Sequence, residues 1–207
     1  MKIELLSITP NAERHIENAA RTSYQSFEKQ TDRSYKPLIK MLIKRGHESV
    51  LEHATASFKI SGVSRALTHQ LVRHRLCSFT QESQRYVNQE NFNFIEPSDI
   101  RNNYTTHKIY LDLMFEIQKK YMRLRQLGIK KEDVRYILPN ATENEIVMTA
   151  NFRELRHIIK LRGEKSAQWE IRNLSLKILE VLKEKVPNIF QDIEIDEKNQ
   201  IVKMKNL

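Results

Sequence analysis

Three segments of the chain alternate apolar and polar residues, which is the pattern of a strand with one buried face. Residues 2–8 read KIELLSI and stop at Thr9-Pro10, residues 53–60 read HATASFKI, and residues 142–150 read TENEIVMTA. The pattern therefore predicts three strands, separated along the chain by long stretches of other structure.

Apolar residues at helical spacing fill most of the remaining chain. The longest predicted helix opens at Ser98 and ends at Gly128, and a short one covers 131–136. The other predicted helices cover residues 11–24, 36–44, 63–75, 151–162 and 167–185. The polar stretch 78–93 is given no regular structure. Because no repeat, low-complexity run or linker interrupts the pattern, we expect residues 1–207 to form a single α+β domain, with a mixed or antiparallel sheet flanked by helices.

The composition is that of an ordinary globular protein, with 40% hydrophobic and 29% charged residues among 207. No stretch approaches the roughly 18 apolar residues of a membrane span, and the first residues turn polar too soon for a secretory signal. With Cys77 as the single cysteine, an internal disulfide and a cysteine-based zinc cage are excluded. We therefore expect a cytoplasmic protein without a membrane partner.

The net charge of +9 indicates a negatively charged partner: nucleic acid, an anionic membrane surface or phosphorylated small molecules. Residues 65–162 contain eleven Arg and six Lys, whereas the rest of the chain contains five Arg and thirteen Lys. Arginine is the bidentate reader of phosphate, although arginines on a solvated helix surface would give the same count. The four glycines exclude a glycine-rich phosphate loop, so side chains and helix ends must hold any nucleotide.

The predicted helix over 63–75 carries polar groups on its apolar face. At about 100° per residue, the polar residues that share or flank the face of Val63, Leu67 and Leu71 are Gln70, His74, Arg73 and Arg75. A lone histidine on such a face is usually a satisfied core residue. A glutamine, a histidine and two arginines at one helix end need partners when buried, and an anionic ligand is the simplest partner.

The predicted helix over 151–162 shows the same anomaly. Asn151 and Arg162 fall within about 20° of each other inside the apolar arc of this helix, and Arg153 and His157 form a second polar pair four residues apart. An arginine turned inward is rarely structural unless it is paired. Two helices that each aim arginine inward indicate a site for phosphate and carbonyl groups.

Other candidate sites are weaker. His47 and His53 with their neighbouring glutamates lack the spacing of a zinc motif, so we expect no metal. Cys77 follows the Arg73–Arg75 segment, whose charges could activate a thiol, but the sequence names no orienting partner and a passive cysteine is favoured. Trp169 is interpreted as a core residue.

The polar residues on the two helices belong to a longer pattern. The segment RHRLCSFTQESQRY (73–86), in which seven residues separate RHR from Ser83, resembles the signature of flavin-dependent thymidylate synthases. The supporting segments are GHESVLEH (46–53), GVSRALTHQLVRHR (62–75), RYILP (135–139), NFRELRHIIKLR (151–162) and AQWEIR (167–172). The resemblance covers nearly the whole chain and implies the fold of that family.

The resemblance also implies roles for the matching positions. The residues implied to bind dUMP are Gln70, Leu71, Val72, Arg73, Gln81, Glu82, Ser83, Gln84, Arg85, Arg135 and Arg162. The residues implied to bind FAD are Ser49, Arg73, His74, Arg75, Gln81, Asn151, Arg153 and His157, with His47 and Glu52 nearby. Arg162 is the implied catalytic group, which would sit against the uracil ring and stabilise negative charge as the pyrimidine is activated.

The implied reaction is the reductive methylation of dUMP to dTMP, in which NADPH reduces FAD and methylenetetrahydrofolate supplies the carbon. The family assembles as a homotetramer whose active sites are shared between subunits. Ser83 is assigned to substrate binding because no adjacent base is evident in its loop. His74 could instead tune the flavin or relay protons.

The chain departs from the family at two places. The family often has Asn-Glu at Thr80-Gln81, which weakens a carboxylate role at position 81, and often a His at Ser166, which removes a flavin contact. Two other classes compete with the enzyme: a nucleic-acid-binding module, which lacks any helix-turn-helix, zinc or RNP-like motif here, and a phosphate-binding protein without catalysis. We expect no nucleic-acid partner.

Overall fold

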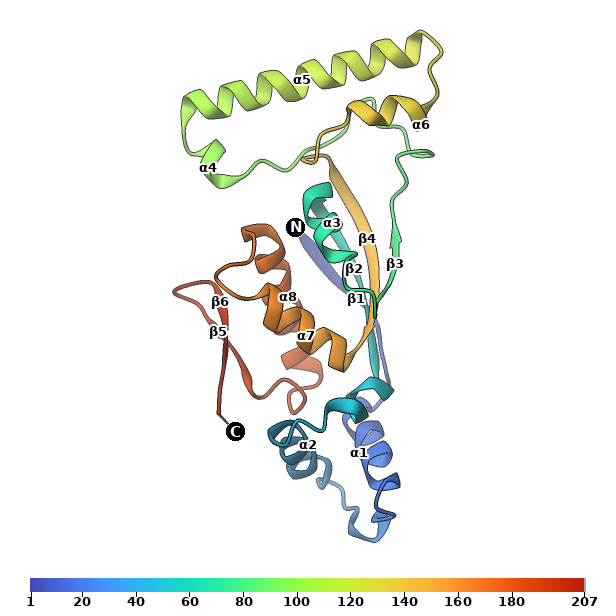
Figure 1. Cartoon of the computed structure of the whole chain (residues 1–207), viewed down its shortest axis with the longest axis vertical. Helices are drawn as coiled ribbons and strands as arrows, with labels where there is room; N and C mark the ends of the chain where they lie inside the picture. Colours follow the sequence, from blue (N-terminus) through green and yellow to red (C-terminus); the bar gives the residue numbers. More distant parts are fainter. Residues whose placement is uncertain (207) are drawn as a thin grey trace. The chain divides into compact units, whose positions relative to one another are not determined.

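The computed structural model describes residues 1–206, in which the chain forms two compact units. The α5 unit comprises Met1–Lys2, Ile60–Gln70 and Thr80–Ile146, and the α7 unit comprises Ile3–Lys59, Leu71–Phe79 and Val147–Leu207. Each unit is named after its most prominent helix (Figure 1). The single-domain organisation expected from the sequence stays a prediction.

One four-stranded sheet has strands in both units. Its order is β1 (Lys2–Ile8), β2 (Thr55–Ser64), β4 (Glu143–Asn151), β3 (Ser78–Gln81). Strands β2 and β4 run antiparallel, since Phe152 N–H donates to the Ala54 carbonyl while the hydroxyls of Ser57 and Thr149 are bonded at 2.7 Å. The three predicted strands are confirmed, and alternate residues of β2 and β4 are buried as their patterns predict.

The α7 unit contains most of the predicted helices. Its helical elements are α1 (Ala12–Thr22), α2 (Tyr35–Lys44), α7 (Phe152–Arg162), α8 (Trp169–Lys185) and the short 3-10 turns η1 (Phe27–Lys29) and η2 (Glu48–His53). Helix α8 buries Leu174, Ile178 and Leu182, the stripe that helical spacing indicates. Helices α7 and α8 lie next to each other on one side of the strands (Figure 1).

A hairpin near the C-terminus is missing from the sequence prediction. Strands β5 (Ile193–Asp196) and β6 (Ile201–Met204) pair antiparallel. The hairpin packs on the end of α7, where Val202 N–H donates to the Gly163 carbonyl at 2.8 Å. A Cβ at position 163 would lie 2.4 Å from Val202 Cγ2, so only glycine allows this close approach.

The α5 unit contains α3 (Arg65–Leu71, except its last residue), α4 (Ser98–Arg101), α5 (Tyr104–Gln126), α6 (Lys131–Val134) and the 3-10 turn η3 (Arg135–Ile137). The single long helix predicted from Ser98 is wrong in one respect. Asn103 interrupts it, because its Oδ1 accepts from the backbone N–H groups of Thr105 and Thr106 and caps a new helix.

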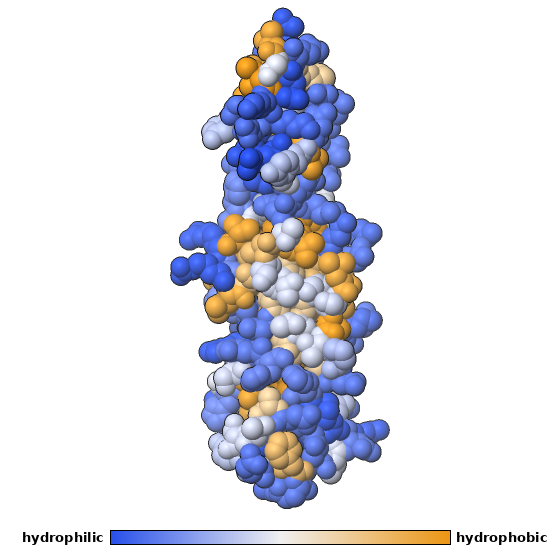
Figure 2. Space-filling model, turned by 90° about the vertical axis from the view of Figure 1, so that its right-hand side faces the viewer, coloured by the Kyte–Doolittle hydropathy of each residue, from blue (hydrophilic) through white to orange (hydrophobic). Residues whose placement is uncertain are grey.

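Apolar side chains reach the surface of the α5 unit among polar ones, as the upper end of Figure 2 shows. The exposed large apolar residues of helix α5 and the turn after it include Ile109, Leu113, Phe115, Leu127 and Ile129. Within residues 1–206, no helix is long and apolar enough to cross a membrane.

The helix predicted over 63–75 is the main error in secondary structure. Strand β2 continues through Ser64, and α3 ends at Leu71. Two turns follow, in which His74 N–H donates to the Leu71 carbonyl and Cys77 N–H donates to the His74 carbonyl. His74 therefore does not lie on an α3 face, and the wheel argument for it is wrong. The polar stretch predicted to lack regular structure begins with the short strand β3.

Candidate functional site

A buried polar cluster lies along helix α7 in the α7 unit. Nε of Arg162 donates a hydrogen bond to Nε2 of His74 at 3.0 Å, and Nδ1 of His74 lies 3.3 Å from Oε1 of Glu154. His157 packs edge-on against the His74 ring, with 5.8 Å between ring centroids. The structure thus brings together three residues that the sequence flagged on two different predicted helices, His74, His157 and Arg162.

Positive charge accumulates around this cluster. Burial and, after it, the nearby charges of Arg162, His157 and Arg73 together lower the pKa of His74 to about 4. Burial and the charge of Arg73 also lower the pKa of Arg162. His74 is consequently neutral at pH 7, which leaves Nε2 able to accept from Arg162. An anion placed here would relieve the repulsion between the cations, so the donor set fits an anionic cofactor.

The same residues could be considered as metal ligands, because the ligand atoms of His74, Glu154 and His157 lie within 4.8 Å of one another. Two features oppose a cation. Nε2 of His74 already accepts from Arg162, and the guanidinium charges of Arg73 and Arg162 act on the same ring. The arrangement suits a negatively charged ligand better, and the absence of a metal stays a prediction.

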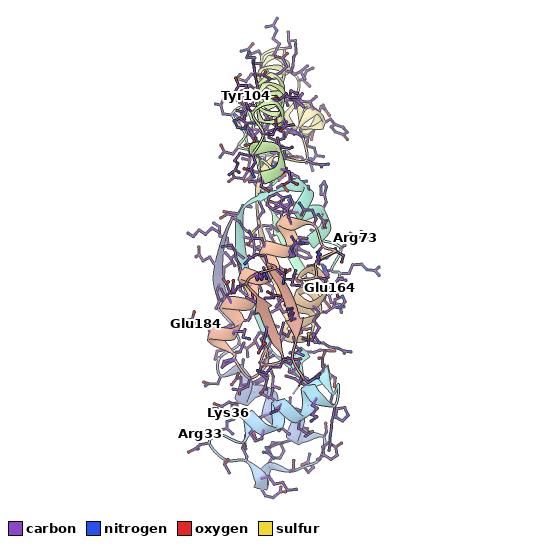
Figure 3. The ribbon with its side chains drawn as sticks, turned by 90° about the vertical axis from the view of Figure 1, so that its left-hand side faces the viewer. Arg33, Lys36, Arg73, Tyr104, Glu164 and Glu184 are labelled. Atoms are coloured by element: carbon purple, nitrogen blue, oxygen red, sulfur yellow. The ribbon has the colours of Figure 1, made fainter. Side chains whose placement is uncertain are left out.

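Except for Gln81, which belongs to the α5 unit, the remaining residues assigned to FAD lie in the α7 unit. Asn151 is the last residue of β4 and the N-cap of α7, where its Oδ1 accepts from Glu154 N–H at 2.9 Å. Arg153 is exposed and paired with Glu52 of η2, which raises the pKa of Arg153. The exposed residues of this set also include Ser49, Arg73 and Arg75, and Figure 3 places Arg73 at the edge of the molecule.

The two residues that follow Gln70 differ in accessibility. Leu71 is fully buried, so its side chain belongs to the core and only its backbone could contact dUMP. Val72 is 39% exposed and offers its side chain to a ligand.

Cys77 is not an activated nucleophile. Burial raises the pKa of its thiol to about 12, and the charge of Glu154 acts in the same direction. Because only the thiolate is nucleophilic, the thiol is inert at neutral pH. The disfavoured alternative, in which Arg75 and His74 lower this pKa, is wrong, and the interpretation of Cys77 as passive agrees with the structure.

The most deeply buried arginine of α7 is one that sequence reasoning missed. Arg156 is 0% exposed; Nη1 and Nη2 each donate to a carboxylate oxygen of Asp192 at 2.7 Å, and Nε lies 3.3 Å from Oε1 of Glu48. Its position was readable, since it lies four residues after Phe152 and three before Ile159, both fully buried. The paired carboxylates make it structural, as expected for a buried charge.

In the α5 unit, the loop predicted to bind dUMP starts with Gln81. Its Nε2 donates to Oγ1 of Thr68 at 2.8 Å and to Oδ1 of Asn144 at 2.7 Å. A glutamate could donate neither bond, so the departure from the family at this position links α3 to β4 through an amide. Glu82 N–H continues the ladder to the Glu145 carbonyl at 2.9 Å, and Oε1 of Glu82 accepts from Gln89.

The next residues of the loop form a turn. Oγ of Ser83 accepts from Arg85 N–H at 3.3 Å, and the Ser83 carbonyl accepts from Val87 N–H at 2.9 Å. A backbone amide is no base, which favours binding over nucleophilic attack for Ser83. Gln84 is buried, and its Nε2 has no hydrogen-bond partner among residues 1–206. Such an orphaned donor indicates that this loop has room for an additional acceptor.

Two arginines near this loop carry uncompensated positive charge. Burial lowers the pKa of Arg65, and the charge of Arg135 lowers it further, only partly offset by Glu82. Nε of Arg135 donates to the Glu132 carbonyl at 3.1 Å. Arg65 was not identified from the sequence; the excess of arginine after residue 65 was the only signal. Arg85, by contrast, is paired with Glu132 at 3.3 Å and stacks over Tyr86.

Comparisons with known proteins agree on one family. The family model described as "Thymidylate synthase complementing protein" matches residues 4–188. The chain is 37% identical over 213 residues to the flavin-dependent thymidylate synthase of Clostridium tetani, covering 92% of this chain and 86% of the relative. It is 42% identical over 190 residues to that of Pyrococcus abyssi, covering 87% and 78%.

The fold agrees with these relatives. A crystal structure of ThyX from Helicobacter pylori in complex with FAD and dUMP superposes with a TM-score of 0.78 at 24% identity, covering 93% of this chain and 99% of the other. This likeness confirms the expected fold, with helices around a sheet whose β2 and β4 run antiparallel.

Proposed function

Because this chain belongs to the family of flavin-dependent thymidylate synthases, we propose that it converts dUMP to dTMP with bound FAD. Methylenetetrahydrofolate is the carbon donor and NADPH the reductant in this proposal. When bound, the flavin supplies hydride transfer, chemistry that no side chain of the protein can perform.

The observation that carries the proposal is the positive cluster along α7. The charges of Arg73 and Arg162 lower the pKa of His74, the charge of Arg73 lowers that of Arg162, and an anionic diphosphate would satisfy both guanidinium groups. The residues that would hold FAD are Ser49, Arg73, His74, Arg75, Gln81, Asn151, Arg153 and His157. Their guanidinium, amide and imidazole groups match phosphate and carbonyl oxygens.

In the α5 unit, the phosphate of dUMP would be received by Arg135, and we add Arg65 to the residues that bind it. Their mutual repulsion favours a dianion between them. Gln70, Ser83, Gln84 and their neighbours would contact the sugar and base, and the orphaned Nε2 of Gln84 would donate to a substrate oxygen.

In the α7 unit, Arg162 would stabilise the negative charge that develops on the pyrimidine. Its Nε is fixed by His74, so the group is held in place before the reaction starts. A preorganised, partly desolvated guanidinium stabilises developing charge better than a solvated lysine. Removal of one such donor typically reduces turnover by about 100- to 1,000-fold.

We further propose a homotetramer whose active sites are shared between subunits, in the cytoplasm. The exposed apolar residues of helix α5 and its following turn, Ile109 and Leu127 among them, are suited to a subunit interface. Sedimentation at several protein concentrations would measure the oligomer directly, and a monomer at micromolar concentration would contradict this part of the proposal.

The visible spectrum of the purified protein is the direct test of function. We expect flavin absorption bands that bleach on anaerobic addition of NADPH, and dTMP once dUMP and methylenetetrahydrofolate are added. A colourless protein that neither takes up FAD nor forms dTMP would refute the proposed activity.

A further inference from the structure

Helix α7 carries a buried carboxylate that the proposed reaction does not use. Glu154 is 7% exposed, and burial raises its pKa, so its ionised form needs a partner. Its Oε1 lies 3.3 Å from Nδ1 of His74, and the charge of His157 partly offsets the effect of burial on its pKa. Its backbone N–H donates to the Asn151 side chain that caps the helix.

The hydrogen bond from Arg162 determines which ring nitrogen of His74 carries the proton. Nε2 accepts from Nε of Arg162 at 3.0 Å and therefore carries a lone pair. A neutral imidazole has one ring proton, so that proton sits on Nδ1, which faces Glu154. The alternative tautomer would place Nε2–H against the N–H of Arg162, with two donors facing each other.

We infer that Glu154 is a positioning residue, whose carboxylate holds the proton on Nδ1 of His74 so that Nε2 accepts from Arg162 and aims its guanidinium. Glu154 and Arg162 are eight residues apart, roughly 12 Å along the helix axis at 1.5 Å per residue, and the His74 side chain bridges them. The role in turnover rests on the proposed function of Arg162, whereas the tautomer does not.

The geometry resembles the general arrangement in which a carboxylate orients a histidine that in turn acts on a third group. Here the third group is a guanidinium instead of a metal or a hydroxyl. His157 packs edge-on against the ring of His74. Within residues 1–206, Glu154 is the one carboxylate that lies within 4 Å of a His74 ring nitrogen.

The test compares three variants of the full-length holoenzyme. Glu154→Leu removes the acceptor at similar volume, and Glu154→Gln keeps an acceptor oxygen without the charge. Glu164→Gln changes an exposed glutamate just beyond α7, labelled in Figure 3, and serves as matched control. Long-range proton–nitrogen NMR at pH 8 reports which ring nitrogen of His74 is protonated, and steady-state kinetics give kcat and KM for dUMP.

We expect wild type, Glu154→Gln and Glu164→Gln to keep the proton on Nδ1, and Glu154→Leu to shift it to Nε2. In Glu154→Leu, kcat should fall about 10- to 100-fold, the range for carboxylates that orient histidines elsewhere, with a smaller change in KM. An unchanged tautomer in Glu154→Leu would overturn the inference, and so would a shifted tautomer with unchanged kcat. If Glu154→Leu shifts the tautomer but the wild-type protein makes no dTMP, the proposed function is refuted and the positioning role of Glu154 stands.

Discussion

Two arginines of the α7 unit, Arg156 and Arg162, are held differently from Arg85 of the α5 unit. In the α7 unit, Arg156 and Arg162 are fixed by buried partners, the carboxylate of Asp192 and the ring of His74. In the α5 unit, Arg85 is half-exposed and its partner Glu132 is similarly exposed. Buried partners preorganise a guanidinium, whereas exposed ones leave it free to exchange partners when a ligand arrives. Arg156 and Arg162 of the α7 unit are thus held as fixed charges, whereas Arg85 of the α5 unit, like the exposed Arg153 of the α7 unit, can exchange partners.

The largest expected effect concerns the buried arginine. Arg156→Met should lower the free energy of unfolding by about 3–5 kcal/mol, because it leaves the buried carboxylate of Asp192 without its cation. The matched change Arg85→Met should cost less than about 1 kcal/mol, because its ion pair is exposed. Urea unfolding of both variants measures the difference. Equal losses would remove the distinction between the two units.

The next effect concerns catalysis. Arg162→Ala should reduce the rate of dTMP formation by about 100- to 1,000-fold while the protein stays folded and oligomeric, because a charge-stabilising donor is lost. Arg162→Lys should recover only part of the rate, since an ammonium lacks the Nε that His74 binds. Single-turnover formation of dTMP is the measurement. Turnover at the wild-type rate in Arg162→Ala would contradict the assignment.

The smallest effect is a pH dependence of stability. His74 has a folded-state pKa of about 4 against an ordinary value of 6.5, so between these values the unfolded chain binds a proton that the folded chain does not. Stability is therefore fully present above pH 6.5 and falls as pH decreases toward 4, by at most about 1.4 kcal/mol per pH unit from this group.

His74→Gln should remove that share of the slope, and His15→Gln, at an exposed position and not among the groups that act on His74, is the control. Urea unfolding at several pH values between 4 and 7.5 gives the slopes. If wild type and His74→Gln lose stability in parallel, His74 is not the buried neutral residue that the structure describes.

Helical spacing gave good predictions wherever an element packs along its whole length. The predicted helices at 36–44 and 167–185 differ from α2 and α8 by at most two residues at an end. Around His74 the same reasoning was wrong, because a continuous apolar pattern conceals where β2 ends, where α3 begins and where two turns follow. The ends of a helix or strand depend on hydrogen bonds to residues that are distant in the sequence, and a local sequence pattern contains no information about them.

The flagged site residues had a mixed outcome. His74, His157 and Arg162 do meet, although the wheel that put His74 on a helix was wrong. Arg156 and Glu154 were overlooked, although both lie on the buried side of α7. Whether each assigned residue contacts dUMP or FAD stays a prediction that ligand binding to single variants would test.

The sequence by itself determined the family, the strands and most helices, because apolar periodicity and a long motif are local properties of the chain. It also predicted a site at which arginine and histidine side chains bind an anion. Only the tertiary structure decided that His74 is neutral and faces Glu154 on one side and Arg162 on the other. The burial and protonation of His74 depend on its distances to Glu154 and Arg162, which are far from it in the sequence, and no local pattern contains those distances.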